Sequence, residues 1–498
     1  MSKFAISAWQ PAKEINDELK KLTSVPIYKV SKEYYDGEVM AYFNDKCKKS
    51  KEITDEAKQF IPGGVQHNLA FNKPFPICIN KAEGAYLYDI DGNSYIDFLQ
   101  SGGPIVLGSN YPEVKKAAIK LISECGPVTG LFHEAELLLA KEINKHMPAV
   151  EMFRMLGSGT ESVMAATRLA RLITRKSRII KMGGAYHGWS DQMVYGLKIP
   201  GTRNMLESHG IAKPLLSLTD EVRPNDLNML EAMLRLNRLK GGTAAVIVEP
   251  VGPESGTRPI DYDYNKNALA LARKYGALFI FDEVVTGFRV GLGGAQGYFG
   301  IEPDLTIFGK VIAGGYPSAG GVGGRKEYVS RLAAGIGGLK KKAYCGGTLA
   351  ANPLSAMAGY VTIKEIEKTD ACVKAGKAGD KVTARLRELI KKYDLPYVAY
   401  NQGSIVHLEC SGAMSFDFSS MFKLKSYLPA LKHKKMMTER KVAMEEMGAA
   451  YTANGIITLA GSRLYTSMAT TDEVIEEALR RFDNVFKHVK KTDEGLLK

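Results

Sequence analysis

In the stretch Ala277-Leu-Phe-Ile-Phe-Asp282, five consecutive apolar residues lead directly into a carboxylate. A second stretch, Leu305-Thr-Ile-Phe-Gly-Lys310, ends in a similar way on an amine. Apolar runs of this length are typical of strands that a parallel sheet buries on both faces. In open α/β sheets, ligands bind outside the carboxyl ends of such strands. We therefore expect Asp282 and Lys310 to face one ligand.

The neighbours of Lys310 set it apart from an ordinary surface lysine. It is followed by Val-Ile-Ala-Gly-Gly, and Arg325 is the only charged residue between it and Lys326. Partial burial in such a stretch favours the neutral, nucleophilic amine. Such lysines form Schiff bases, and pyridoxal 5′-phosphate is the cofactor that combines one with a carboxylate at its pyridinium nitrogen. Taken singly, Asp282 would more simply be a helix cap and Lys310 a solvated lysine.

A candidate phosphate site lies upstream, at Leu156-Gly-Ser-Gly-Thr-Glu161. The residues after it place apolar side chains at three- and four-residue steps and arginines on the other side, which predicts an amphipathic helix. Free N–H groups at the start of this helix, with the hydroxyls of Ser158 and Thr160, can bind a dianion. An ordinary helix cap is the alternative. A dinucleotide fingerprint is disfavoured because Ser162 stands where its third glycine would be.

Eight motifs in chain order resemble the class III aminotransferases of fold type I, and among them most closely glutamate-1-semialdehyde 2,1-aminomutase. They span about residues 55 to 485. The resemblance implies an α/β fold with a large domain, built on a mostly parallel sheet flanked by helices, and a smaller α+β domain. The motifs are Glu83-Gly-Ala-Tyr-Leu-Tyr-Asp-Ile-Asp-Gly92, Gly157-Ser-Gly-Thr-Glu161, Gly184-Ala-Tyr-His-Gly188, Val248-Glu-Pro-Val251, Asp282-Glu-Val-Val-Thr-Gly-Phe-Arg289, Gly293-Gly-Ala-Gln-Gly-Tyr-Phe-Gly300, Pro303-Asp-Leu-Thr-Ile-Phe-Gly-Lys310 and Gly346-Gly-Thr-Leu-Ala-Ala-Asn-Pro353.

Four segments are predicted from this resemblance and from the alternation of strand and helix signals. They are an N-terminal helical extension (1–50), the N-terminal part of the small domain (51–116), the large cofactor-binding domain (117–345) and the C-terminal part of the small domain (346–498). Within the extension, the stretch from Lys13 to Leu22 has helical spacing. The extension either covers the dimer or the pocket mouth, or is flexible and inert.

The resemblance also implies a role for each site residue. Lys310 would hold pyridoxal 5′-phosphate as a Schiff base, and Asp282 would face the ring nitrogen. Tyr186 would stack on the ring with His187 beside it, although a Tyr-His pair after a strand could equally be core packing. The phosphate would be bound by Ser158, Gly159 and Thr160. Thr348 resembles a residue that reaches the phosphate of the neighbouring subunit, so a homodimer with a shared active site is expected.

The chain departs from the aminomutase pattern at four positions near the substrate. Leu69 stands about where the aminomutase has an arginine for the substrate carboxylate, and Gly102 stands in place of a tryptophan. Glu254 matches an asparagine near the cofactor, so it would change the electronics of the ring or attract a cationic substrate group. Arg463 could supply a replacement carboxylate clamp. A surface or ion-paired arginine is the simpler interpretation.

Amino-group transfer on a small amino acid or amine is the function that these features favour. Transfer within one molecule, as in an aminomutase, and transfer between molecules, as in an aminotransferase, both remain open. Racemisation or epimerisation of an amino acid is a further outcome of the same chemistry. A regulator without catalysis is the competing class, but residues 1–50 are too short for an attached DNA-binding domain and lack a helix-turn-helix pattern.

Composition agrees with a cytoplasmic enzyme without specifying one. The six cysteines form no CxxC pair, and the eight histidines include no HExxH motif, so neither a disulfide framework nor a metal is expected. The net charge of +13 is spread over dispersed lysine clusters without a recognised nucleic-acid module. No apolar run is long enough to span a bilayer, and residues 1–7 lack a secretory signal, so neither nucleic acid nor membrane is an expected partner.

Overall fold

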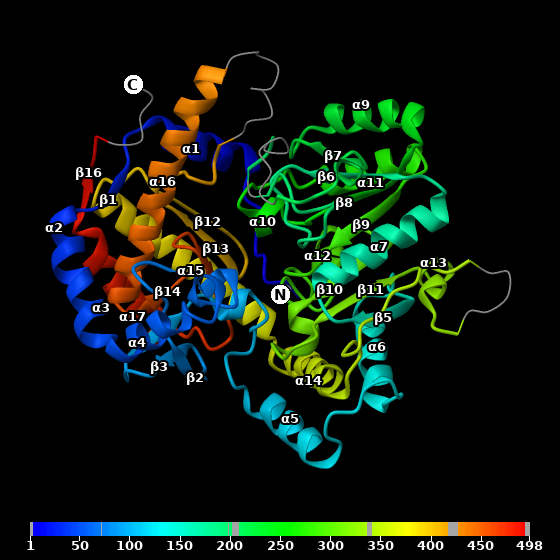
Figure 1. Ribbon diagram of the computed structural model, residues 1–498, viewed down its shortest axis with the longest axis horizontal. Helices are drawn as coiled ribbons and strands as arrows, with labels where there is room; N and C mark the ends of the chain where they lie inside the picture. Colours follow the sequence, from blue (N-terminus) through cyan, green and yellow to red (C-terminus); the bar gives the residue numbers. More distant parts are fainter. Residues whose placement is uncertain are drawn as a thin grey trace.

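Two lobes make up the computed structural model, which describes residues 3–70, 72–197, 199–201, 209–335, 341–416 and 427–493, the last range without side chains for 427–434. One lobe contains the middle of the chain, and the other combines N-terminal and C-terminal segments (Figure 1). None of the helices in these ranges is both long and apolar enough to cross a membrane.

A seven-stranded sheet forms the centre of the first lobe, in the order β5-β11-β10-β9-β8-β6-β7. All neighbours are parallel except β11, which runs antiparallel to both β5 and β10. The predicted mostly parallel sheet is therefore confirmed. The strands are β5 (Met152–Leu156), β6 (Arg178–Met182), β7 (Thr219–Val222), β8 (Thr243–Val248), β9 (Leu278–Asp282), β10 (Leu305–Gly309) and β11 (Gly320–Gly324).

Helices bury both faces of this sheet, which explains why its strands are continuous apolar runs. On β8, Ala245 and Ile247 pack with helix α7 (Gly159–Thr174). The alternate residues Val246 and Val248 pack on the other side, with helices α9 (Leu227–Asn237) and α11 (Tyr264–Lys274). The shorter helices in this lobe are α8 (Lys213–Leu216), α10 (Pro253–Gly256), α12 (Gly294–Phe299) and α13 (Lys326–Val329). Three longer helices pack together below the sheet in Figure 1: α5 (Pro112–Glu124), α6 (Glu134–His146) and α14 (Pro353–Thr369).

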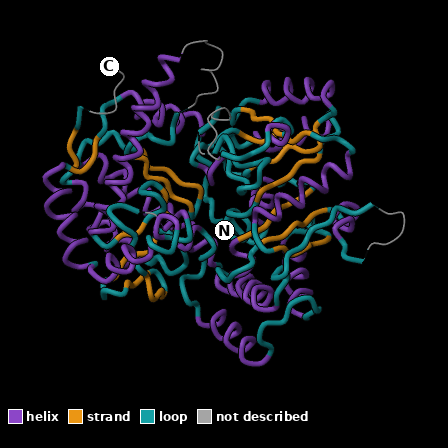
Figure 2. The backbone as a smooth tube through the Cα atoms, viewed as in Figure 1, coloured by secondary structure: helices purple, strands orange, loops and turns teal. Residues whose placement is uncertain are grey.

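Three smaller sheets and most of the remaining helices form the second lobe (Figure 2). Two of these sheets join distant parts of the chain, because β14 pairs with β4 and β16 pairs with β1. The strands are β1 (Tyr28–Val30), β2 (Ile79–Glu83), β3 (Tyr86–Asp89), β4 (Ser94–Asp97), β12 (Val398–Gln402), β13 (Ile405–Glu409), β14 (Ile456–Ile457), β15 (Arg463–Tyr465) and β16 (Val489–Lys491). The helices are α2 (Lys32–Tyr34), α3 (Met40–Lys46), α4 (Lys48–Ala57), α15 (Ala371–Lys392), α16 (Tyr427–Ala453) and α17 (Asp472–Phe486).

The N-terminal segment runs between the two lobes before it enters helix α1 (Ala12–Ser24), which confirms the helical spacing found there. Ala5 donates its N–H to the carbonyl of Val290 at 2.7 Å. On its other side it packs against helix α15 so closely that a Cβ atom at Gly376 would lie 2.0 Å from the Ala5 oxygen. Trp9 donates its indole N–H to the carbonyl of Ile260 at 3.0 Å. The segment thus contacts both lobes.

Candidate active site

Asp282 and Lys310 lie at the carboxyl ends of neighbouring parallel strands. Asp282 is the last residue of β9 and pairs in register with Ile307 of β10. Lys310 follows the end of β10, is half-buried, and has φ of +50°, a left-handed conformation that is unusual for a lysine. Such conformations persist only where the surrounding structure holds them, and they cluster at active sites. The sheet therefore brings the predicted acid and base to one edge.

His187 is the main partner of Asp282. Its Nδ1 lies 2.6 Å from Asp282 Oδ2, while the N–H of Val284 donates to Asp282 Oδ1 at 3.1 Å. Burial lowers the pKa of His187, and the neighbouring carboxylate opposes this shift. The other ring nitrogen, Nε2, is buried without a hydrogen-bond partner among the described residues. His187 thus holds the orientation of Asp282.

Lys181 fixes the loop that carries Tyr186 and His187. This fully buried lysine of β6 donates from Nζ to the carbonyls of Ala185, Met193 and Tyr195, at 3.1, 3.2 and 2.6 Å. It thereby joins both ends of the loop that follows the strand. Tyr186 as a whole residue remains 46% exposed, so it is available to contact a ligand. No local sequence pattern indicates this role for Lys181.

The predicted phosphate turn forms the N-terminus of helix α7. The Ser158 hydroxyl accepts the N–H of Glu161 at 3.2 Å, as an ordinary helix cap does. The N–H groups of Gly159 and Thr160 belong to the first helical turn, so they have no acceptor within the helix. A Cβ atom at Gly188 would lie 2.4 Å from Thr160 Oγ1, so only glycine allows this loop to approach the turn.

Lys310 contacts a second glycine-rich turn, which belongs to the other lobe. A Cβ atom at Gly103 would lie 3.5 Å from Lys310 Cδ and 3.6 Å from Tyr465 Cζ. The buried guanidinium of Arg289 donates to the carbonyls of Gly103 and Ile105, at 2.9 and 2.6 Å. Burial lowers the pKa of Arg289 to about 10. Arg289 lies in one of the eight motifs, but no local sequence pattern indicates that it positions this turn.

Glu254 and Arg463 form a largely buried salt bridge of 2.7 Å between the two lobes. Arg463 also donates to Thr257 Oγ1 at 2.9 Å, while the N–H of Glu254 donates to Glu249 Oε1 at 2.9 Å. Burial acts to lower the pKa of Arg463, but Tyr465 and Glu254 raise it above its ordinary value. Of the two interpretations of Arg463, the ion-paired one describes this structure.

Two further buried carboxyl groups surround this pair. Burial, reinforced by Asp282 and Glu254, raises the pKa of Glu249 to about 8. Burial also raises the pKa of Glu409 to about 7, against the opposing effect of Arg463. Neither carboxylate oxygen of Glu409 has a hydrogen-bond partner among the described residues. The motif at residues 248–251 contained Glu249, whereas nothing in the sequence singled out Glu409.

The remaining predicted residues lie at the edge of the site. Leu69 is 41% exposed, and its Cδ1 would lie 3.4 Å from a Cβ atom at Gly102. Thr348 is exposed, and its neighbour Gly347 faces the Glu161 carboxylate, because a Cβ atom there would lie 3.6 Å from Oε2. The Thr348 loop thus borders the phosphate turn of its own chain.

The donor set fits pyridoxal phosphate. A helix N-terminus with free N–H groups suits a phosphate dianion. The carboxylate of Asp282 suits a protonated ring nitrogen, and the Lys310 amine suits an aldehyde. The half-exposed ring of Tyr186 can stack on a pyridine. The close approach of Gly188 to Thr160 keeps the phosphate turn and the tyrosine loop together.

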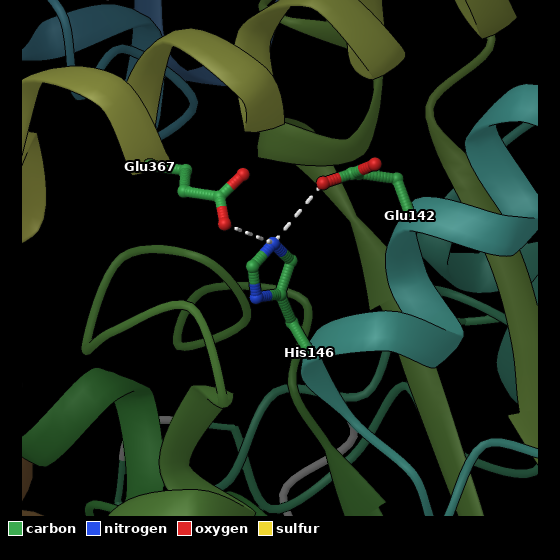
Figure 3. A group of neighbouring side chains, drawn as sticks. All are labelled: Glu142, His146 and Glu367. Carbon is green, nitrogen blue, oxygen red and sulfur yellow. Dashed lines mark hydrogen bonds and ion pairs between the residues drawn. The ribbon is translucent and has the colours of Figure 1, made fainter.

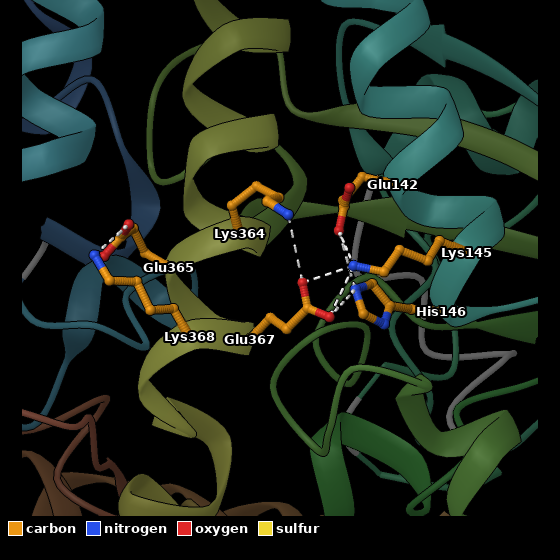
Figure 4. A network of polar contacts seen from close by, with 7 residues as sticks. All are labelled: Glu142, Lys145, His146, Lys364, Glu365, Glu367 and Lys368. Carbon is orange, nitrogen blue, oxygen red and sulfur yellow. Dashed lines mark hydrogen bonds and ion pairs between the residues drawn. The ribbon is translucent and has the colours of Figure 1, made fainter.

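One group among the described residues has the spacing of a metal site, outside this edge of the sheet. The ligand atoms of Glu142, His146 and Glu367 lie within 4.8 Å of one another (Figure 3). Lys145 donates to Glu142 and Glu367 at 3.0 and 2.7 Å, and Lys364 lies 3.6 Å from Glu367 (Figure 4). Because ammonium groups already neutralise both carboxylates, this is a salt-bridge network that joins helices α6 and α14.

Known proteins resemble the chain over most of its length. Residues 69–486 match the sequence profile described as aminotransferase class-III. A glutamate-1-semialdehyde 2,1-aminomutase 2 of Brevibacillus brevis is 39% identical over 365 residues, which are 72% of this chain and 83% of that protein. An omega-transaminase of Sphaerobacter thermophilus superposes with a TM-score of 0.76 at 24% identity, over 90% of this chain and 99% of its own. A glutamate-1-semialdehyde-aminomutase of Pseudomonas aeruginosa PAO1 in complex with PMP superposes with a TM-score of 0.76 at 20% identity. The superposition covers 95% of this chain and 98% of that protein.

Proposed function

The chain belongs to the class III aminotransferase family, and from this premise we propose that it transfers an amino group between two molecules, from an amine to a keto acid. As a member of this family it is an enzyme of amino-group transfer that uses pyridoxal phosphate. The amino group would pass between two molecules rather than within one. Its donor is an amine without a carboxylate near the reacting carbon, and its acceptor carries a carboxylate.

The salt bridge between Glu254 and Arg463 carries this proposal. A planar guanidinium is the side chain best suited to grip a carboxylate. Here Glu254 occupies it at 2.7 Å, inside the protein. An amine donor can enter while the pair stays closed, whereas a keto acid gains Arg463 only by displacing Glu254. A clamp with two states suits two successive substrates, which transfer between molecules requires.

Each proposed residue has a defined task. Bound pyridoxal phosphate supplies a carbonyl for the amine and a ring that accepts electrons. Gly159 and Thr160 would bind its phosphate through their N–H groups, and Asp282 would keep a proton on its ring nitrogen. Lys310 would carry it covalently, and its Nζ would then move the proton at the substrate carbon. The turns packed around Lys310 would limit the access of water to that transfer.

A second copy of the chain would complete the site through Thr348. Exposed apolar side chains support such a contact, because Tyr344 and Leu349 in the same loop are 72% and 60% exposed. Mixing Lys310→Ala chains with Thr348→Asp chains tests this arrangement. If each site draws Lys310 from one chain and Thr348 from the other, one site of each mixed dimer is intact and activity returns. Two inactive parents that stay inactive together, despite forming mixed dimers, would contradict a shared site.

Purified enzyme with single amino compounds, with and without a keto acid, tests the direction of transfer. We expect more than one equivalent of carbonyl product per active site only when the keto acid is present, because without it the amino group of the amine can pass only once to the bound cofactor. Repeated turnover of a single amino compound to an isomer without any keto acid would exclude an obligatory aminotransferase and favour the aminomutase activity by which the Brevibacillus brevis relative is named. Arg463→Lys is the sharper probe, because it should raise the KM for the keto acid and leave the KM for the amine nearly unchanged.

A further inference from the structure

An apolar cavity of about 300 Å³ lies in the second lobe, beside the candidate active site. It is enclosed by helix α3, the β2–β3 hairpin, strand β14 and the end of helix α16. Its volume is at the lower end of the range for small-molecule sites, which is roughly 300–1,000 Å³. Six apolar side chains supply much of its wall: Phe43, Phe75, Ile77, Leu87, Leu99 and Ile457.

The cavity is continuous with the turn that contacts Lys310. Leu69 and Ser101 both line it. Ser101, Gly102 and Gly103 are consecutive residues with φ of +55°, +81° and +114°. A Cβ atom at Gly103 would lie 3.5 Å from Lys310 Cδ, and one at Gly102 would lie 3.4 Å from Leu69 Cδ1. The turn therefore has Lys310 on one side and the mouth of the cavity on the other, and its glycines place no side chain between them.

Three polar side chains of the lining, those of His67, Asn72 and Lys73, have partners within the protein. Lys73 forms a salt bridge of 2.8 Å with Glu445. His67 Nδ1 accepts the N–H of Leu69 at 3.1 Å, and Asn72 donates its side-chain amide to the Leu69 carbonyl at 3.2 Å. The charge of Lys73 is thus compensated, and its ammonium is directed to helix α16. This lining suits an uncharged apolar group.

We propose that this cavity binds the apolar tail of the amine donor, with Leu69 at its entrance and the amino group directed to Lys310. The inference rests on the proposed function and names the donor as a primary amine with an unbranched apolar chain. The acceptor would use the opposite side, where Tyr465 contacts the same turn and Arg463 lies two residues away on β15. Donor and acceptor would thus be recognised by different walls of one site.

A series of unbranched primary amines, from propylamine to decylamine with pyruvate as acceptor, tests the inference on the holoenzyme. Each methylene buried in the cavity should raise kcat/KM about fourfold until the cavity is full. The gain should appear mainly in KM, because tail binding is the same before and during the reaction. Octanol, which cannot react, should compete with octylamine more strongly than propanol does.

Thr452→Phe should fill the cavity from the last turn of helix α16 and lower the ratio of kcat/KM for octylamine to that for propylamine about tenfold or more. Thr369→Phe is the matched control, because Thr369 is also partly buried at the end of a helix but lies outside the cavity lining. Leu69→Arg, at a more exposed position, should lower the same ratio without filling the core.

A wild-type enzyme that transfers no amino group from any of the amines would overturn the proposed function and this inference together. A wild-type enzyme that transfers amino groups with kcat/KM independent of chain length would overturn the inference alone. The same holds if both Leu69→Arg and Thr452→Phe match Thr369→Phe in their chain-length profiles.

Discussion

The Asp282 carboxylate has two roles. It is buried against His187, and it would also face the ring nitrogen of the cofactor. Its burial is compensated by hydrogen bonds from His187 and from the N–H of Val284. A neutral amide of the same shape could keep much of this geometry. It could not hold a proton on the ring nitrogen. One substitution can therefore separate the structural role of Asp282 from its effect on the protonation of the cofactor.

Asp282→Asn should retain folding and some cofactor binding but lower kcat about 10²- to 10⁴-fold, the range typical of lost proton-transfer groups. Steady-state kinetics, with circular dichroism and visible absorption as checks, measure this. Asp304→Asn is a fitting control, because Asp304 is also a buried sheet carboxylate that accepts a backbone N–H, from Phe279. Turnover undiminished in Asp282→Asn would remove Asp282 from its proposed role.

Glu409 should make the stability of the protein depend on pH. Its pKa is raised to about 7 in the folded chain, above its ordinary value of 4.5, so the folded state holds its proton over a wider range. The contribution of Glu409 to stability is therefore greatest below about pH 4.5 and is lost as pH rises towards 7, by ~3 kcal/mol in total. Unfolding of wild type and Glu409→Gln in urea at pH 5, 6, 7 and 8 measures this. As pH rises, the free energy of unfolding of Glu409→Gln should increase relative to that of the wild type. A difference in free energy that does not change with pH would refute the prediction.

At the scale of elements, strand β6 and the loop after it form one unit through Lys181. Lys181→Met should leave the carbonyls of Ala185, Met193 and Tyr195 without this donor, at a cost of about 2–4 kcal/mol. Amide exchange should accelerate in residues 183–197, and cofactor affinity should fall about tenfold, because this loop carries the predicted stacking tyrosine.

Lys176→Met is the matched control for this loop. Lys176 also donates to two backbone carbonyls, at 2.8 and 2.6 Å, but these belong to Tyr275 and Gly276. It should change stability without loosening residues 183–197. Equal exchange in that loop for both variants would show that Lys181 acts on the fold as a whole rather than on the tyrosine loop.

The elements themselves could be predicted from the sequence more readily than their partners. Strands β9 and β10 are nearly continuous apolar runs, so their ends and the residues that follow them could be located directly. Glu254 and Arg463 were each recognised, but they lie 209 positions apart, and no local pattern indicates that one neutralises the other. The partners of Lys181 were missed for the same reason. They belong to a turn whose shape depends on the folded loop.

At the scale of the whole molecule, the N-terminal segment couples the lobes through a contact that only glycine permits. In the full chain, Gly376→Ala should destabilise the protein by about 1–3 kcal/mol, because its Cβ would lie 2.0 Å from the Ala5 oxygen. In a chain that lacks residues 1–7, the same substitution should be neutral or stabilising, because alanine is the better helix former within α15. Thermal unfolding of the full and the shortened chain, each with and without Gly376→Ala, measures this coupling. If Gly376→Ala lowers stability equally in the full and the shortened chain, the contact with Ala5 is not the cause.

This segment also has a consequence for the order of folding. A ribosome makes Ala5 well before Val290, whose carbonyl accepts the Ala5 N–H, and before Ala371, where the helix that packs behind Ala5 begins. Hundreds of residues must therefore be synthesised after Ala5 before this segment can settle, and contacts between such distant residues form slowly. A segment made early would thus be among the last to reach its final place.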